Sequence, residues 1–331
     1  NNRYAVNDAN ETFPRLAPKN RLDNWGIPSH IDTLIITQPQ YFNKLEVLLD
    51  SLPLSQLKQL TVFHTVNSSS QIMSGSLEKK YWLFYKSNVQ GARVQQPAPK
   101  RALQMVNKLL PEALGLLYAK RYGNEQTNAR ISQMITYIIA AYKKRIQALS
   151  WMAPGTKNKA IQKLDSMDIR VGYPTSWDVF HDLELTPDNS YYQNQIVLRQ
   201  WLRKQNISLL NQDLTNKPWR LFPHQVNAQY FPDTNQIIIP AALLQPPLYD
   251  AQGDMASNFG SIGAIIGHEI THAFDRIGAR YDVQGNLNPW WTTSDDTQFN
   301  MLTQALDHQY KAIELKDSLV VNAALTRNEN I

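Results

Sequence analysis

The sequence predicts a mainly α-helical protein in two parts that meet near residue 190. Residues 1–190 contain several runs in which apolar side chains recur at helical spacing. Residues 191–331 differ, because short β-branched segments there precede a helical run rich in small residues. We therefore expect a helical first part, and a second part that combines helices with a few strands.

The composition is that of a globular protein. Its 331 residues suffice for one large domain or two ordinary ones, with 43% hydrophobic and 18% charged residues. No stretch approaches the roughly 18 apolar residues of a membrane helix, so we expect no membrane segment in this portion. The net charge is +5, but no block of lysine and arginine exceeds three residues. We therefore expect no nucleic-acid partner.

Cysteine is absent from the sequence, which excludes disulfides, thiolate metal sites and cysteine nucleophiles. This absence favours the reducing cytoplasm of a bacterium as the compartment. The first residues include no initiator methionine and no signal peptide, and the last residues have no recognisable terminator. Both ends resemble cuts inside a longer protein, so export of the whole protein stays open.

The first helices of the chain are predicted by leucine spacing and by proline. Residues 31–52 place three leucines at helical spacing, and the segment after Pro53 predicts a second helix. Residues 101–123 predict another helical run, which Pro111 should divide or kink, because proline removes a backbone donor.

The clearest amphipathic helix of the first part spans residues 129–152. Its apolar positions recur on one face and its last turns are basic, which suits the helix dipole. Residues 153–167 predict another helix, which begins after a Pro-Gly turn. Residues 170–174 (RVGYP) are interpreted as a loop.

The second part begins with two short extended segments around a turn at residues 232–235 (PDTN). The second segment, residues 236–240 (QIIIP), is β-branched and closed by Pro240, as an edge strand would be. Residues 256–278 then predict a helix with small residues on its early turns, which favour close packing or the close approach of a substrate.

That helix contains the pattern H-E-x-x-H. His268 and His272 lie four residues apart, so both imidazoles project from one face and can hold one Zn²⁺. Glu269 is rotated away from the pair and can take a proton from a metal-bound water and pass it to a leaving amine. The pattern therefore indicates the hydrolysis of an amide bond, with Glu269 as the general base.

The third protein ligand is not fixed by spacing. A histidine six residues after His272 is excluded, because position 278 is glycine. Asp295 and Asp296 lie at a suitable distance, but their setting is more typical of a helix cap. No glutamate occurs between Glu269 and Glu314, so Glu314 and Glu329 both stay open as ligands.

Several longer segments identify a family. They are NAQY (227–230), IIIPAALLQPPLYD (237–250), SIGAIIGHEITHAFD (261–275) and GNLNPWW (285–291), preceded upstream by TQPQYFNKLEVLL, LLYAKRYG, LSWMAPGTKNKAIQKL and RVGYP. In this order they resemble the neprilysin family of zinc endopeptidases, which includes the bacterial oligopeptidase O enzymes. In that family the third ligand is the glutamate of an E-N-x-A-D motif, and the chain ends in ENI. The resemblance therefore implies Glu329 as the third ligand.

The resemblance also implies residues that hold the substrate. Asn227 and Ala228 would bond its backbone, and the strand around Ile237 would pair with it as an added strand. Gln229 departs from the aromatic residue usual in the family, which puts one minor contact in doubt. An apolar pocket for the side chain after the cleaved bond would be lined by Leu243, Leu248, Tyr249, Ala264 and Ile265, although spacing alone favours ordinary core positions for these residues.

The family architecture implies a two-lobed zincin with one Zn²⁺ per chain. Residues 191–331 would form a thermolysin-like catalytic lobe, and residues 1–190 part of a helical lobe that encloses the cavity and admits short peptides. Cleavage is expected on the amino side of hydrophobic residues. The aspartate of the E-N-x-A-D motif, a histidine and an arginine would follow Ile331, so the other parts of the same enzyme are expected partners. A polypeptide ending at Ile331 is expected to be inactive.

Two alternatives remain at this stage. One is a non-catalytic segment that binds peptides or serves adhesion. The other is a zinc peptidase of different architecture with Glu314 as its third ligand.

Overall fold

The computed structural model describes residues 2–73, 75–177, 180–211, 217–313 and 320–331. Within them the fold is mainly helical with a few short strands, as predicted. The chain forms two compact units: unit 1 comprises Asn1–Met105 and Phe180–Thr215, and unit 2 comprises Val106–Val179 and Asn216–Ile331. The chain therefore passes between the units three times, which differs from the single boundary expected near residue 190.

Unit 1 consists of helices and a two-stranded antiparallel sheet, in which Tyr4 lies opposite Leu34. Its strands are β1 (Arg3–Ala5) and β2 (Thr33–Ile35). Its helical elements are α1 (Val6–Thr12), α2 (Pro18–Trp25), α3 (Pro39–Ser51), α4 (Leu54–Ser69), η1 (Ser70–Ile72), α5 (Gly75–Tyr81), η2 (Trp82–Val89), α10 (Tyr191–Ser208) and η3 (Leu209–Asn211). The helices predicted around the three leucines and after Pro53 are confirmed as α3 and α4.

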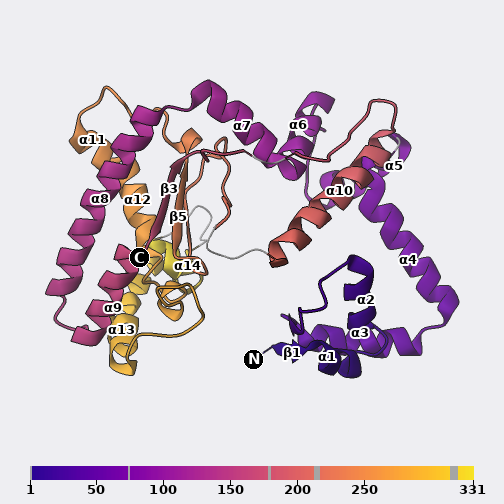
Figure 1. The fold of residues 1–331 in the computed structure, drawn as a ribbon, viewed down its shortest axis with the longest axis horizontal. Helices are drawn as coiled ribbons and strands as arrows, with labels where there is room; N and C mark the ends of the chain where they lie inside the picture. Colours follow the sequence, from indigo (N-terminus) through magenta and orange to yellow (C-terminus); the bar gives the residue numbers. More distant parts are fainter. Residues whose placement is uncertain (1, 74, 178–179, 212–216, 314–319) are drawn as a thin grey trace. The chain divides into compact units, whose positions relative to one another are not determined.

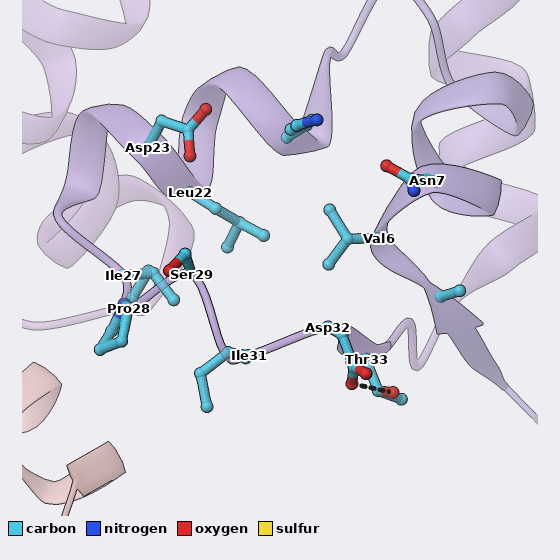
Figure 2. A pocket seen from close by; sticks show the side chains of 12 residues that line it. Val6, Asn7, Leu22, Asp23, Ile27, Pro28, Ser29, Ile31, Asp32 and Thr33 are labelled. Atoms are coloured by element: carbon cyan, nitrogen blue, oxygen red, sulfur yellow. Dashed lines mark hydrogen bonds between the residues drawn. The ribbon is translucent and has the colours of Figure 1, made fainter.

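A cavity of about 490 Å³ lies within unit 1, lined by the start of α1, by α2 and by the loop that leads into β2 (Figure 2). Its charged lining residues are Lys19, Asp23 and Asp32. It contains none of the residues that the sequence predicted to bind metal or substrate.

Proline divides the helical run at residues 101–123, as predicted. Helix α6 (Ala98–Leu109) ends just before Pro111, which is the first residue of α7 (Pro111–Tyr122). Proline suits the first turn of a helix, because the backbone N–H that it lacks would have no partner there.

Unit 2 contains a three-stranded sheet, in which β3 and β5 lie side by side (Figure 1). The strand order is β3-β5-β4. Strand β3 (Asp168–Gly172) runs parallel to β5 (Gln236–Pro240), and β4 (Gln229–Phe231) runs antiparallel to it. Two predictions were therefore wrong. The RVGYP segment begins in a strand instead of a loop, and β5 is the central strand instead of an edge. Pro240 is accommodated because it is the last residue of β5, opposite Gly172.

Helices cover this sheet and complete the core of unit 2. Helix α8 (Glu125–Ala148) contacts both β3 and α12 (Ile262–Thr271), and α9 (Pro154–Asp165) packs against α8. The predicted apolar face of α8 is confirmed, because Ile131, Met134 and Ile135 are buried in the core with Ile237, Ile239, Ile262, Ile266 and Ile270.

The long helix predicted at residues 256–278 is divided. Helix α11 (Met255–Gly260) and α12 are separated at Ser261, which has non-helical backbone angles. Helix α12 ends at Thr271, and short helices η4 (Ala241–Leu243) and η5 (Gly278–Arg280) flank this region. The chain then forms α13 (Thr293–Lys311) and α14 (Ala323–Asn330). Among the described residues, none of the helices combines the length and the apolar character needed to span a membrane.

Candidate metal centre

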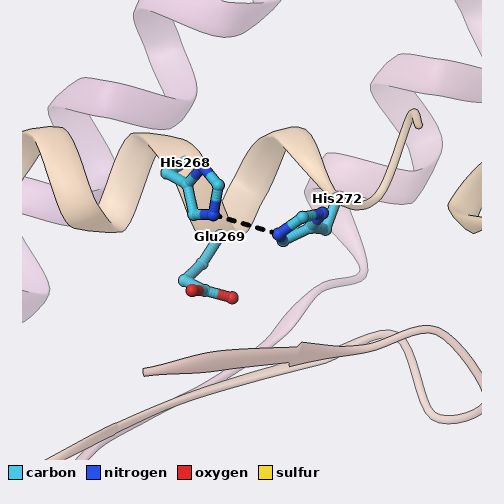
Figure 3. Close-up of side chains that lie close together, drawn as sticks. All are labelled: His268, Glu269 and His272. Atoms are coloured by element: carbon cyan, nitrogen blue, oxygen red, sulfur yellow. Dashed lines mark hydrogen bonds between the residues drawn. The ribbon is translucent and has the colours of Figure 1, made fainter. Parts of the chain in front are cut away.

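Helix α12 brings His268 and His272 together. Their Nε2 atoms lie 3.1 Å apart, and both side chains are partly buried (Figure 3). Two nitrogen ligands at about 2.1 Å from one tetrahedral zinc ion lie about 3.4 Å from each other. The measured separation is close to this, so the two imidazoles fit a shared zinc ion.

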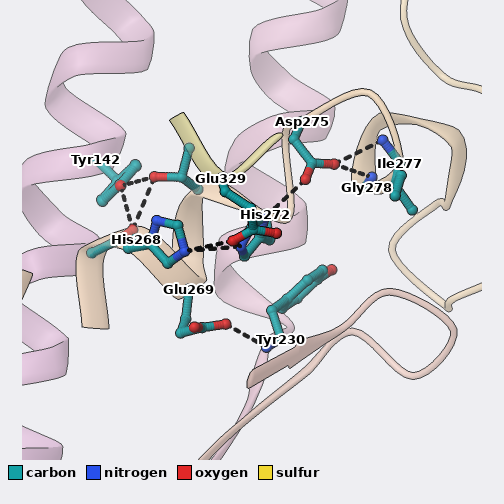
Figure 4. A network of polar contacts seen from close by, with 11 residues as sticks. Tyr142, Tyr230, His268, Glu269, His272, Asp275, Ile277, Gly278 and Glu329 are labelled. Carbon is teal, nitrogen blue, oxygen red and sulfur yellow. Dashed lines mark hydrogen bonds and ion pairs between the residues drawn. The ribbon is translucent and has the colours of Figure 1, made fainter. Parts of the chain in front are cut away.

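Helix α14 brings a third donor to the same place. The Oε2 atom of Glu329 lies 3.4 Å from Nε2 of His268 and 3.7 Å from Nε2 of His272 (Figure 4). The donor set of two imidazoles and one carboxylate is typical of catalytic zinc sites, which keep a fourth position open. The other glutamate left open by the sequence, Glu314, lies outside the described residues.

Glu269 belongs to the same cluster but points elsewhere. It forms a group with His268 and His272 in which the potential ligand atoms lie within 4.8 Å of one another. Its carboxylate, however, is directed toward β4, where Oε2 accepts a hydrogen bond of 2.9 Å from the backbone N–H of Tyr230. This bond distinguishes Glu269 from Glu329, whose carboxylate faces both histidines.

The surroundings of Glu269 alter its acidity. Burial raises the pKa of its carboxyl group above the ordinary value, although His272, the Tyr230 N–H and His268 act in the opposite direction. A raised pKa brings a carboxylate closer to the range in which it exchanges protons efficiently near neutral pH.

Asp275 fixes the ring of His272, a role that our sequence interpretation missed. Its Oδ2 atom lies 2.8 Å from Nδ1 of His272, and its Oδ1 atom accepts hydrogen bonds from the backbone N–H groups of Ile277 and Gly278, both at 2.7 Å. The hydrogen bond from His272 to Asp275 is the main reason why the pKa of His272 is raised. With Nδ1 held in this way, Nε2 is free to bind a metal. The signal available in the sequence was an aspartate three residues after the second histidine.

The loop that carries Asp275 requires a glycine at position 278. A Cβ atom there would lie 1.9 Å from the backbone oxygen of His272. The loop is also held by Lys163 of α9, which is 1% exposed and donates hydrogen bonds of 2.7 Å to the carbonyl oxygens of Gly278 and Tyr281. Burial lowers the pKa of Lys163 to about 8, against the opposing influence of Asp275 and Asp282.

Tyr142 of α8 contacts the backbone and a side chain of α12 beside the two histidines. Its hydroxyl group donates a hydrogen bond of 2.7 Å to the carbonyl oxygen of Gly267 and lies 2.6 Å from Oγ1 of Thr271. Each of these residues immediately precedes one of the two histidines. Neither Tyr142 nor Lys163 was predicted, because no local pattern connects them to a motif more than a hundred residues away.

The residues expected to bind the peptide backbone lie at an edge of the sheet. Asn227 is exposed and Ala228 is buried, just before β4. Strand β5 is paired on both sides by β3 and β4, so the strand around Ile237 has no free edge for a substrate. That expectation was wrong. Within the described residues, β4 pairs only with β5, so its other edge is open, and this edge lies next to the candidate site.

The residues expected to line the side-chain pocket are mostly core residues. Leu243 and Tyr249 are each 4% exposed and belong to the core of unit 2, while Leu248 and Ile265 pack against that core. Ala264 is exposed on α12. The packing thus brings four of these five residues into one cluster.

Family comparisons agree with the motifs. Models of "Peptidase family M13" match residues 1–174 and 227–331. The chain is 30% identical over 275 residues to a neutral endopeptidase of Lactobacillus helveticus, covering 83% of this chain and 42% of that protein. It is 29% identical over 302 residues to a neutral endopeptidase of Lactococcus lactis, covering 91% of this chain and 48% of that protein. The chain thus spans about half the length of these curated relatives.

Solved structures agree with the fold. The crystal structure of PepO from Lactobacillus rhamnosis matches with a TM-score of 0.88 and 28% identity, covering 99% of this chain and 52% of that one. The structure of the zinc metalloprotease Zmp1 of Mycobacterium tuberculosis in complex with an inhibitor matches with a TM-score of 0.83 and 31% identity. This match covers 94% of this chain and 50% of that one. Together with the cluster of His268, Glu269 and His272, these matches confirm zinc as the cofactor.

One family model alone covers more than half of the chain, and the second includes His268, Glu269, His272 and Glu329. The resemblance read from the motifs is therefore confirmed: this chain belongs to peptidase family M13, the neprilysin family of zinc metallopeptidases.

Proposed function

We infer that the complete protein is a zinc-dependent endopeptidase, in which His268, His272 and Glu329 are the protein ligands of the metal and Glu269 is the general base. One observation carries this proposal: the Glu329 carboxylate lies 3.4 and 3.7 Å from the Nε2 atoms of the two histidines, with Glu269 beside them. Zinc held at these residues supplies a Lewis acid that polarises a carbonyl group and lowers the pKa of water.

The chain's own residues supply proton transfer. Glu269 takes a proton from the attacking water and passes it to the leaving amine, which completes the cleavage of the peptide bond. The Tyr230 N–H, at 2.9 Å, orients the carboxylate for this transfer. Asp275 holds His272 in the tautomer that presents Nε2 to the metal.

The same hydrogen bond supports a binding mode for the substrate. The Tyr230 N–H is directed to Glu269 and not to its neighbour in β5, Ile237. The general base therefore lies along the free edge of β4. A peptide that adds to this edge as an extra strand would run past Glu269, with Asn227 and Ala228 bonding its backbone.

The proposed specificity rests on the five residues that the family resemblance assigns to the side-chain pocket. Leu243, Leu248, Tyr249, Ala264 and Ile265 carry no charge, so we propose cleavage on the amino side of Leu, Phe, Ile and similar residues. One methylene group is worth only about 1–3 kcal/mol in such a pocket, so the preference should be broad. The restriction to short peptides rests on the family architecture, in which a helical lobe encloses the cavity.

Digestion of a defined peptide mixture by the zinc-loaded full-length protein tests this function. Mass spectrometry of the products should locate cuts before hydrophobic residues, and a chelator should abolish them until zinc is restored. A folded protein that contains the same cleavable sequences serves as the control and should stay intact. Cleavage mainly before Asp or Lys, or activity that survives complete removal of zinc, would contradict the proposal.

A further inference from the structure

We propose that the ion pair between Arg327 and Asp307 is a positioning device that turns Glu329 toward the two histidines. The pair joins α14 to α13 and lies outside the metal centre itself. This inference rests on the proposed role of Glu329 as a zinc ligand. In it, the contact between Arg327 and Asp307 holds that ligand in position.

The geometry of the pair is that of a strong, directional contact. The Nε atom of Arg327 lies 3.0 Å from Oδ1 and 3.1 Å from Oδ2 of Asp307, and the Nη2 atom also contacts Oδ2. The two side chains are only 16% and 10% exposed. A guanidinium that contacts both carboxylate oxygens fixes orientation as well as distance, which a single point contact does not.

Helix α14 has few other means of holding its orientation. It has eight residues, far fewer than an isolated helix needs to be stable in water. Ala323 is its buried residue, whereas Leu325 is 82% exposed. Burial of apolar surface therefore contributes little to the docking of α14, and its polar contacts take on more weight. The Asn322 side chain caps the first turn of α14, but this contact lies within the helix and does not fix its orientation.

The helical spacing explains how the pair acts on Glu329. Residues two positions apart on an α-helix point about 200° apart, because each residue advances the helix by about 100°. Arg327 therefore anchors one face of α14 to α13, while Glu329 projects from the opposite face toward His268 and His272. Fixing the first face sets the rotation of the helix about its axis, and so the position of the ligand oxygen.

The surroundings of Asp307 make the test feasible. Lys311 and Arg276 are also close enough to interact with its carboxylate electrostatically, so loss of Arg327 does not leave Asp307 without neighbouring cations. We therefore expect the fold to persist in Arg327 variants while the rotation of α14 becomes less restricted.

Zinc affinity of the full-length protein, measured by competition with a chromophoric chelator, tests the inference. Arg327→Ala should raise the dissociation constant for zinc by about tenfold or more, the range typical of groups that support a metal ligand. Asp307→Asn should have a similar effect. Arg327→Lys keeps the charge but loses the two-oxygen contact, so its effect should be intermediate. Arg220→Ala, which removes an ion pair with Asp233 elsewhere in unit 2, is the matched control and should leave zinc affinity unchanged.

A double-variant cycle separates positioning from a merely structural role. If Arg327 acts through Glu329, then Arg327→Ala should add less than about a twofold effect when Glu329→Ala is already present. Unchanged zinc affinity in Arg327→Ala and Asp307→Asn, with a large loss in Glu329→Ala, would overturn the positioning role alone. An equally large effect of Arg327→Ala in the Glu329→Ala background would also overturn it. Unchanged affinity in Glu329→Ala itself would instead refute the proposed ligand.

Discussion

Asp275 lies 2.8 Å from the ring of His272, so that one buried carboxylate connects a proposed zinc ligand to the loop after its helix. Asp275→Ala removes this contact and the acceptor for two backbone N–H groups of the loop. We expect zinc affinity to fall by about 10- to 100-fold. Asp233→Ala, at an exposed ion pair, is the control and should bind zinc as tightly as the unaltered protein. Equal zinc affinity in both variants would show that His272 needs no such support.

Glu269→Gln separates proton transfer from metal binding. Glutamine keeps the shape of the side chain and can still accept the hydrogen bond from the Tyr230 N–H, but it cannot take a proton from water. We expect unchanged zinc content and a loss of turnover of at least about 100-fold, measured with a fluorogenic peptide and the full-length protein. Glu125→Gln, on an exposed turn of α8, should hydrolyse the peptide normally. Near-normal turnover in Glu269→Gln would remove Glu269 from the mechanism.

Lys163 should make the free energy of unfolding depend on pH in the alkaline range. Burial lowers its pKa from 10.5 to about 8 in the folded protein. Between these values the unfolded chain binds the proton more tightly, so the free energy of unfolding should rise as the pH rises from 8 to 10.5. Below about pH 8 the folded protein bears the cost of burying the charge.

Urea unfolding of Lys163→Met at several pH values measures this effect, because methionine does not titrate. Relative to Lys163→Met, the unaltered protein should become more stable as the pH rises from 8 to 10.5. The gain in unfolding free energy should be at most about 3 kcal/mol. Lys159→Met, on the exposed face of the same helix, should show a constant difference. A constant difference for Lys163→Met as well would mean that the buried amine does not titrate there.

Local features of the sequence predicted much of the metal centre. The H-E-x-x-H spacing was sufficient to bring two imidazoles to one face of a helix, because helical geometry within one turn depends little on the rest of the chain. The cap expected around Asp295 is also confirmed, since its side chain forms a capping box with Thr292. The break at Pro111 followed from the missing backbone donor of proline.

The features that the sequence did not predict depend on distant contacts. Residues 168–172 form strand β3 because they pair with β5, more than sixty residues later. Their short sequence shows no clear alternation of apolar and polar residues that would have predicted a strand. The same pairing makes β5 central. Lys163 was not recognised because a buried lysine is identified by the carbonyl oxygens around it, and those belong to a loop more than a hundred residues away. Glu329 was assigned through the family motif, since spacing left Glu314 equally open.

Zinc-edge anomalous diffraction from crystals of the full-length protein tests the central claim most directly. The account predicts one zinc ion per chain, bonded to Nε2 of His268, Nε2 of His272 and a carboxylate oxygen of Glu329 at about 2.0–2.2 Å. Glu269 should stay outside bonding distance and keep its contact with the Tyr230 N–H. An anomalous peak whose third protein ligand is Glu314 or Glu269, or the absence of zinc from these histidines, would contradict the account.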